Sequence, residues 1–238
     1  MRDKIKNKEY FEKFILNKSS SINELEKELQ ERILKQGEDW RADYVFRLRL
    51  ADLQLIQIEA MYSLGLPLMD IKEVLLKMIE NFCKSREKTG AHDQLLSTIS
   101  MAILLGVDET DIKKLTDLIS KIEFKDYLVD FLLHGLTPEW KIKSSKMKIP
   151  KPYLYIQDIL NAETKEQAYI LLKEFVEKKW YNGSRGYLWY NSHKMVERDT
   201  YSGYWCFVAG AVSKLLELDD TSLKDCQYYP YDMVHFND

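Results

Sequence analysis

The sequence has few cysteines and lacks the segments that carry a protein into or across a membrane. The cysteines Cys83, Cys206 and Cys226 are an odd number without CxxC spacing, which predicts free, mostly buried thiols and neither a disulfide framework nor a zinc site. Residues 1–10 are charged throughout and lack the apolar stretch of a secretory signal. No window approaches the roughly 20 apolar residues of a membrane span. We therefore expect a cytoplasmic protein without a membrane partner.

Charge is nearly balanced in total but unevenly distributed along the chain. The net charge of −3, from 35 basic and 38 acidic residues, argues against a nucleic-acid-binding protein. Residues 91–140 carry 4 basic and 9 acidic side chains, and residues 201–238 carry 2 and 6. The intervening residues 141–200 carry 12 basic and 7 acidic side chains. Such blocks are either ordinary solvated faces or an acidic surface that attracts a basic partner.

The apolar residues are spaced as in helices, and the alternation typical of strands is missing over any useful length. The sequence therefore predicts an all-α protein, a multi-helix bundle. Helix starts are predicted by two capping-box patterns, Ser21-x-x-Glu24 and Thr164-x-x-Gln167, and by the candidate N-caps Asp70 and Asp108. Helix ends are predicted where a glycine follows an apolar stretch, at Gly37, Gly65, Gly90, Gly106 and Gly135.

A segment rich in lysine and proline suggests a domain boundary. Residues 140–152 read WKIKSSKMKIPKP and show no apolar periodicity. We expect two packed helical domains, residues 1–140 and 153–238, joined by an exposed linker at 141–152. In the second domain, small residues favour a central helix from about Tyr204 to Leu216, because they let another helix approach closely.

Patterns that would indicate catalysis are weak. The dipeptide His92-Asp93 lacks the earlier histidine that metal phosphohydrolases need, and Gly90 interrupts the ribonuclease-like pair of Arg86 and His92. There is no glycine-rich phosphate loop and no GxSxG motif. Five residues could be assembled into a metal site but lack helical ligand spacing: His193, Glu197, Asp199, Asp232 and His235. We predict no catalytic residue, no metal and no cofactor, and a binding protein instead of an enzyme.

The segment from Tyr201 to Phe236 is the most distinctive part of the sequence. Asp219 or Asp220 can cap a short turn, and Pro230 fixes the chain direction. We expect this aromatic tail to hold the last helix against its domain. The residues that define the tail motif are Tyr204, Trp205, Leu223, Tyr228, Tyr229, Pro230, Tyr231 and Asp232.

This tail resembles that of the PoNi immunity proteins, which protect bacteria against polymorphic-toxin DNases of the PoNe type. The similarity rests on Gly203-Tyr204-Trp205, on Leu218-Asp219-Asp220-x-Ser222-Leu223-Lys224-Asp225, and on Tyr228-Tyr229-Pro230-Tyr231-Asp232. It extends to Lys178-Lys179-Trp180-Tyr181, Trp189-Tyr190-x-Ser192-His193, Leu104-Leu105-Gly106-Val107-Asp108 and Pro138-Glu139-Trp140. Cys226 and Gln227 depart from the family pattern, which has a histidine or similar polar residue there, and this weakens the case for a site at that place.

The resemblance implies two helical domains and a cytoplasmic inhibitor that binds a metal-dependent nuclease toxin stoichiometrically. Because a DNase presents a basic groove to phosphates, we expect carboxylates of the immunity protein to contact it. The predicted contact residues are Asp108, Glu109, Asp111, Asp117, Asp126, Asp130, Asp219, Asp220 and Asp225. Three alternatives stay open: binding away from the nuclease groove, a helical adaptor without a toxin, and a helical metal-dependent hydrolase that uses His193 and the late aspartates.

Overall fold

The computed structural model describes residues 1–85, 92–149, 151–195 and 198–236. Within these ranges the chain forms helices, turns and loops without a β-strand, which confirms the predicted all-α class. The chain divides into two compact units, each built from segments that are separated in the sequence. Unit 1 comprises residues 1–90, 108–122 and 195–203, and unit 2 comprises residues 91–107, 123–194 and 204–238.

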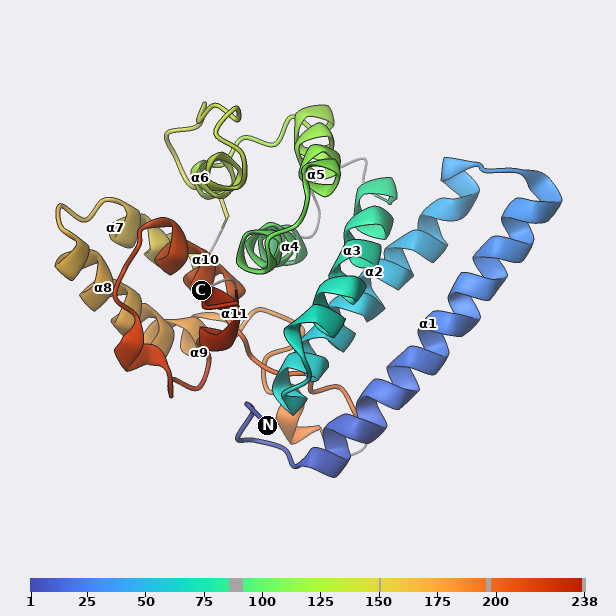
Figure 1. The fold of residues 1–238 in the computed structure, drawn as a ribbon, viewed down its shortest axis with the longest axis horizontal. Helices are drawn as coiled ribbons and strands as arrows, with labels where there is room; N and C mark the ends of the chain where they lie inside the picture. The colour runs from blue at the N-terminus through green and yellow to red at the C-terminus, as the bar shows by residue number, and fades with distance from the viewer. Residues whose placement is uncertain (86–91, 150, 196–197, 237–238) are drawn as a thin grey trace. The chain divides into compact units, whose positions relative to one another are not determined.

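Unit 1 is built on three helices that follow one another in the chain. Figure 1 shows α1 and α2 as long antiparallel helices joined by a short loop, with α3 running beside α2. A later helix, α5, packs against α3. The helices of this unit are α1 (Lys8–Gln36), α2 (Trp40–Leu64), α3 (Leu68–Lys84) and α5 (Glu109–Lys121).

The start of α1 lies well before the predicted capping box. Asn7 is the N-cap, and its side chain accepts a hydrogen bond from the backbone N–H of Tyr10 at 3.0 Å. Ser21 lies inside the helix and donates to the carbonyl of Asn17 instead of capping. The reason is that the buried face continues upstream through Phe11 and Phe14, so tertiary packing extends the helix past a local start signal.

Two other predicted helix boundaries in unit 1 have different outcomes. Asp108 caps α5 as predicted, accepting from the backbone N–H of Asp111 at 3.0 Å. Asp70 is not a cap, because α3 begins at Leu68 after Pro67. Its carboxylate lies in the first turn, where the helix dipole favours a negative charge.

A segment that is distant in sequence is joined to unit 1 by hydrogen bonds to Tyr10 of α1 and Ser63 of α2. The hydroxyl of Tyr10 donates to the carbonyl of Tyr201 at 2.9 Å and accepts from its N–H at 3.0 Å. Ser63 donates to the carbonyl of Ser202 at 2.7 Å. These bonds join Tyr201 and Ser202 to unit 1, although the chain before residue 195 and after residue 203 belongs to unit 2.

Unit 2 contains shorter helices and more irregular chain. Its α-helices are α4 (His92–Leu105), α6 (Tyr127–Leu136), α7 (Ile156–Leu160), α8 (Lys165–Glu174), α9 (Trp180–Gly183), α10 (Phe207–Leu215) and α11 (Tyr231–Val234). The 3₁₀ helices are η1 (Tyr153–Tyr155), η3 (Ser192–Lys194) and η4 (Thr221–Leu223), and η2 (Phe175–Lys179) is a π-helix. As predicted, Thr164 caps α8 by accepting from the N–H of Gln167.

The helix α10 is the central element of unit 2, although it starts later than predicted. It packs against α4, α6, α8 and α11. A methyl group added at Gly210 would lie 2.7 Å from Cγ of Pro230, so glycine permits the close approach of the tail. Gly135 does not end its helix as predicted but lies inside α6, where an added methyl group would collide with the side chain of Leu215. Gly37, Gly65 and Gly106 do follow helix ends with positive φ, and Gly90 lies outside the described residues.

The segment expected to be an exposed linker has mostly exposed side chains, but two buried carboxylates hold its backbone against α6. Asp126 accepts from the N–H groups of Lys148 (2.5 Å) and Ile149 (3.1 Å), and Asp130 accepts from those of Lys143 (3.0 Å) and Ser144 (2.8 Å). Residues 141–149 are therefore part of unit 2, and the division between the units does not follow the predicted limits at residues 140 and 153.

Candidate partner-binding site

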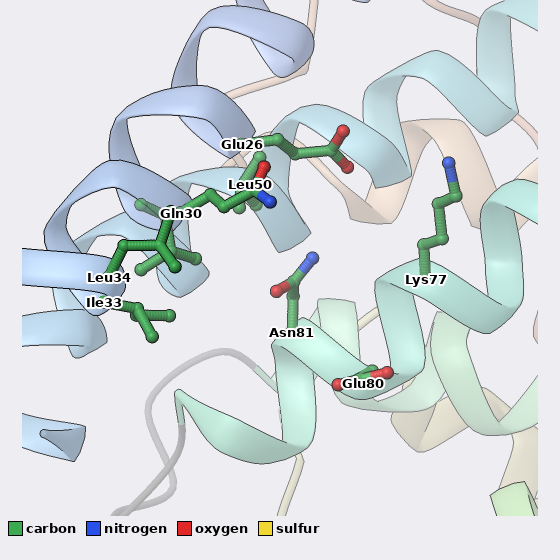
Figure 2. Close-up of a pocket in the computed structure, with 9 residues that line it drawn as sticks. Glu26, Gln30, Ile33, Leu34, Leu50, Lys77, Glu80 and Asn81 are labelled. Carbon is green, nitrogen blue, oxygen red and sulfur yellow. The ribbon is translucent and has the colours of Figure 1, made fainter. Parts of the chain in front are cut away.

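A groove in unit 1 runs between α1 and α3, with α2 beneath it. It encloses about 570 Å³. Figure 2 shows side chains of α1 on one side of the groove and side chains of α3 on the other. The groove is lined by Glu26, Leu29, Gln30, Ile33 and Leu34 of α1, Leu50 of α2, and Lys77, Glu80 and Asn81 of α3.

The α1 wall and the floor of this groove are mainly apolar. Leu29 and Leu50 belong to a small buried cluster between α1 and α2, and Ile33 packs against it. Leu34, at the same wall, leaves 78% of its surface exposed. Leu29 and Leu50 are themselves buried, so the accessible apolar surface of the groove comes from Ile33 and Leu34.

The α3 wall is polar, and two of its residues, Glu80 and Asn81, are hydrogen-bonded to other side chains. Glu80 pairs with Lys84 at 2.9 Å, and this hydrogen bond is the main reason that the pKa of Glu80 is lowered. Asn81 accepts from Arg47 at 3.3 Å and donates to Gln54 at 3.2 Å, so it connects α3 to two residues of α2. The Nε2 of Gln54 is buried without an acceptor among the described residues.

A second hollow, of about 390 Å³, lies at the end of α2 that faces the α1–α2 loop. It is lined by Glu38, Trp40, Asp43, Arg47, Cys83, Lys84 and Lys121. The carboxylate of Asp43 is engaged by the guanidinium of Arg32. The side chain of Arg47 is 10% exposed, and its NH2 nitrogen lies 3.8 Å from a carboxylate oxygen of the exposed Glu38, beyond hydrogen-bond distance. We call this hollow the cationic pocket, because Arg47, Lys84 and Lys121 outnumber its carboxylates.

Five of the nine acidic residues predicted to contact a partner are exposed. Asp108, Glu109 and Asp117 lie at or on α5 of unit 1, and Asp117 pairs with Lys113 at 3.0 Å. Asp219 and Asp225 lie beside η4 of unit 2. The acidic block of residues 91–140 is therefore divided between the two units.

The other four predicted contact residues are buried and bond to groups of their own chain. Asp111 pairs with Lys114 at 2.8 Å. Asp126 caps α6, and Asp130 accepts from the indole N–H of Trp140 at 2.9 Å, besides the bonds to the 141–149 segment. Asp220 accepts from Tyr229 at 2.6 Å and contacts His235 at 2.9 Å. In this conformation these carboxylates bond to groups of their own chain and are not accessible to a partner.

The tail motif is integrated into the core of unit 2. The N–H of Cys206 donates to the carbonyl of Tyr228 at 2.8 Å, and Trp180 donates to the carbonyl of Tyr204 at 2.8 Å. Lys214 of α10 donates to the carbonyl of Val234 at 2.6 Å. Leu223 and Tyr229 are buried, as are Trp205 and Pro230, whereas Tyr231 is half-buried and Asp232 is exposed. These contacts hold α11 and the tail on α10.

The candidate catalytic residues have structural partners where the structure describes them. Asp93 accepts from the hydroxyl of Tyr153 and from the indole N–H of Trp189 (3.0 Å). The Nδ1 of His193 lies 2.7 Å from the hydroxyl of Tyr204. The described residues contain no group of three or more His, Cys, Asp or Glu that could hold a metal ion. Arg86, Gly90 and Glu197 lie outside the described residues.

The three cysteines are free thiols, as the sequence predicts. Cys206 is buried, and Cys83 and Cys226 are half-buried. Burial raises the pKa of Cys83 to about 12, which keeps this thiol protonated and unreactive near neutral pH. No helix within the described part of the chain has the length and apolarity to cross a membrane.

Two family models match successive parts of the sequence. One is described as "PoNe immunity protein (PoNi), N-terminal" and matches residues 2–117. The other is described as "PoNe immunity proteins (PoNi), C-terminal" and matches residues 124–233. The chain belongs to the PoNi family. The resemblance inferred from the tail motif is thereby confirmed for both halves of the chain.

A solved structure shares the fold of this PoNi protein. The crystal structure of protein PA2201 from Pseudomonas aeruginosa matches with a TM-score of 0.66 at 15% sequence identity, over 93% of this chain and 87% of that chain. At this identity the likeness concerns the fold alone. No curated protein sequence matches the chain.

The sequence prediction does not include the residues of the groove or of the cationic pocket. One signal for them is present in the sequence of α2, where Arg47 and Gln54 share a helical face with the buried Leu50 and Ile58. A charged residue and an amide in the middle of an apolar stripe indicate a buried polar network. The partner that completes this network, Asn81, comes from α3 and requires the tertiary structure to be found.

Proposed function

We propose that this PoNi protein binds a cognate nuclease toxin and neutralises it, protecting the cell that makes both proteins. The observation that carries the proposal is the match of both halves of the chain to models of PoNe immunity proteins. The proposal places the protein in the cytoplasm, where a DNase would otherwise reach the chromosome. Neutralisation requires only a stable complex and no reaction catalysed by the immunity protein.

Co-expression tests this proposal. The nuclease encoded beside this gene is induced in cells that carry the immunity gene, an empty vector or a different immunity gene. We expect survival only with the matched immunity gene, and a stoichiometric complex in a pull-down of the two tagged proteins. Equal survival of cells with and without the gene would contradict the proposal.

Within this function, we propose that exposed carboxylates help to capture the toxin. The candidates are the five exposed members of the predicted set: Asp108, Glu109, Asp117, Asp219 and Asp225. A nuclease surface that binds phosphates is basic, so carboxylates would attract it over several ångströms and speed the encounter. Affinity requires in addition a well-packed apolar contact that excludes water.

A further inference from the structure

We propose that the groove and the cationic pocket of unit 1 form one continuous site that holds an amphipathic helix of the toxin. The helix would lay an apolar stripe against α1 and place a carboxylate at Arg47. This inference rests on the proposed function, because it takes the nuclease as the partner. It adds to that function the surface of the immunity protein that binds the nuclease and the chemistry of the nuclease segment that is bound.

The register of the helices places the two hollows next to each other. On α2 the groove ends at Leu50, and the cationic pocket begins one turn away at Arg47. On α3 the corresponding step leads from Asn81 to Lys84. Residues three or four apart lie on the same face of a helix, so both hollows open on the same side of α2 and α3.

The apolar part of the site favours a helix over an extended segment. The wall and floor are helical side chains and offer no free sheet edge to a partner backbone. An extended segment would bury backbone N–H and C=O groups without partners, whereas a helix satisfies its own. Leu34, exposed, and Ile33, half-buried, would both be covered, which removes apolar surface from water beside the cluster of α1 and α2.

The polar end of the site favours a carboxylate. Asn81 fixes the Arg47 guanidinium through one NH group, and the remaining N–H groups have no hydrogen-bond acceptor among the described residues. Lys121 lines the same pocket and adds positive charge, whereas Lys84, also part of the lining, is paired with Glu80. The nearest carboxylate, that of the exposed Glu38, stays 3.8 Å away, so an acidic side chain of the partner would make a closer, bidentate contact.

The apolar contact is tested by a matched pair of leucine substitutions on α1. Leu34 lines the groove, whereas Leu16 is similarly exposed, at 70%, and lies outside both hollows. The probe is the catalytically inactivated nuclease encoded beside this gene, and binding is measured by calorimetry. We expect Leu34→Glu to raise the Kd about tenfold or more, and Leu16→Glu to change it less than about twofold.

The carboxylate contact is tested at Lys121, because substitution of the buried Arg47 could unfold the protein. We expect Lys121→Glu to raise the Kd about fivefold, and Lys121→Arg to keep wild-type affinity, since only the charge is needed. Lys178→Glu, an exposed charge reversal on η2 of unit 2, serves as the control and should leave the Kd unchanged.

The outcomes separate this inference from the proposed function. If wild-type protein binds and protects while Leu34→Glu and Lys121→Glu bind equally well, the groove is not the docking site, and the immunity function still stands. If the wild-type protein itself fails to bind the inactivated nuclease or to protect cells, the proposed function is wrong. Far-UV circular dichroism of each variant confirms that the helices remain folded.

Discussion

One group of side chains in each unit uses its polar atoms differently from the other group. In unit 2, the carboxylates of Asp126, Asp130 and Asp220 accept hydrogen bonds from their own chain, and the tail motif is packed onto α10. In unit 1, Arg47 keeps N–H donors without acceptors among the described residues, and Leu34 stays exposed beside a groove. Internally satisfied groups stabilise a fold, whereas unsatisfied donors next to exposed apolar surface are suited to binding.

The largest expected effect is the loss of stability of unit 2 in the variant Asp126→Ala. The change removes the acceptor of four N–H groups, two in the first turn of α6 and two in the 141–149 segment. We expect unit 2 to lose about 3–4 kcal/mol of stability, because buried donors are left unpaired. Urea unfolding followed by tryptophan fluorescence measures this loss, since four of the five tryptophans belong to unit 2.

Asp219→Ala is the control for this prediction. Asp219 is exposed and, within the described part of the chain, accepts from the N–H and hydroxyl of Thr221 alone, at 3.2 and 2.7 Å. We expect a loss below about 1 kcal/mol. Similar losses for the two variants would show that the Asp126 carboxylate does not hold the 141–149 segment, and the contrast between the units would weaken.

Gly210→Ala tests how tightly the tail packs onto α10. The added methyl group would lie 2.7 Å from Cγ of Pro230 and 3.1 Å from Cγ2 of Val234, and a proline ring cannot rotate away. We expect a net loss of about 1–2 kcal/mol despite the better helix propensity of alanine. Gly186→Ala places the added atom more than 4 Å from any other described residue except its chain neighbours, and should be close to neutral. Wild-type stability of Gly210→Ala in the same urea experiment would contradict this packing.

Asp93→Asn should alter how the stability of unit 2 depends on pH. Burial raises the pKa of Asp93, outweighing the hydrogen bonds from Tyr153 and Trp189, which lower it. An acid with a higher pKa in the folded state binds more protons there, so its contribution to stability is full at low pH. That contribution is lost as the pH rises from the unfolded pKa of about 4 through the folded pKa.

The comparison of wild type with Asp93→Asn isolates this contribution. Asparagine cannot titrate but keeps an oxygen that accepts from one of the two donors. We expect the stability of the wild type to fall more steeply than that of the variant between pH 4 and pH 8 in urea unfolding. Parallel curves would show that Asp93 titrates alike in the folded and unfolded chain.

Neutralising exposed carboxylates should have the smallest effect and should act on the association rate. The triple variant Asp108→Asn, Glu109→Gln and Asp117→Asn removes three charges on α5, next to the α3 wall of the groove, and asparagine at 108 can still cap the helix. We expect association with the nuclease to slow about threefold to tenfold at low salt, with dissociation little changed.

The corresponding variant in unit 2 sharpens the comparison. Asp219→Asn and Asp225→Asn remove two exposed charges from the unit that lacks the proposed groove. We expect a smaller effect than that of the α5 variant in stopped-flow measurements over a range of salt concentrations. A larger effect of the unit 2 variant would indicate that the carboxylates that attract the nuclease lie on unit 2.

Local signals in the sequence predict much of the helical structure. Asp108 and Thr164 cap their helices as predicted, and Gly65 ends α2. The prediction at Ser21 is wrong because a local capping pattern competes with the buried stripe that Phe11 begins, and the burial of large side chains outweighs one cap.

Tertiary contacts account for what the sequence does not reveal. Composition indicates that residues 141–152 are polar, but only the fold brings Asp126 and Asp130 against their N–H groups. For the same reason, composition does not distinguish the buried carboxylates from the exposed ones. The groove and the cationic pocket combine residues from several helices, so neither the apolar wall of the groove nor the surroundings of Arg47 can be predicted from any single segment.

Hydrogen–deuterium exchange on the complex with inactivated nuclease tests most directly whether unit 1 provides the binding surface. The account predicts slower exchange at residues 26–34 and 77–84 when the nuclease is bound, with the 126–149 and 220–235 segments of unit 2 unchanged. Slower exchange confined to unit 2, with the groove exchanging as in the free protein, would contradict it.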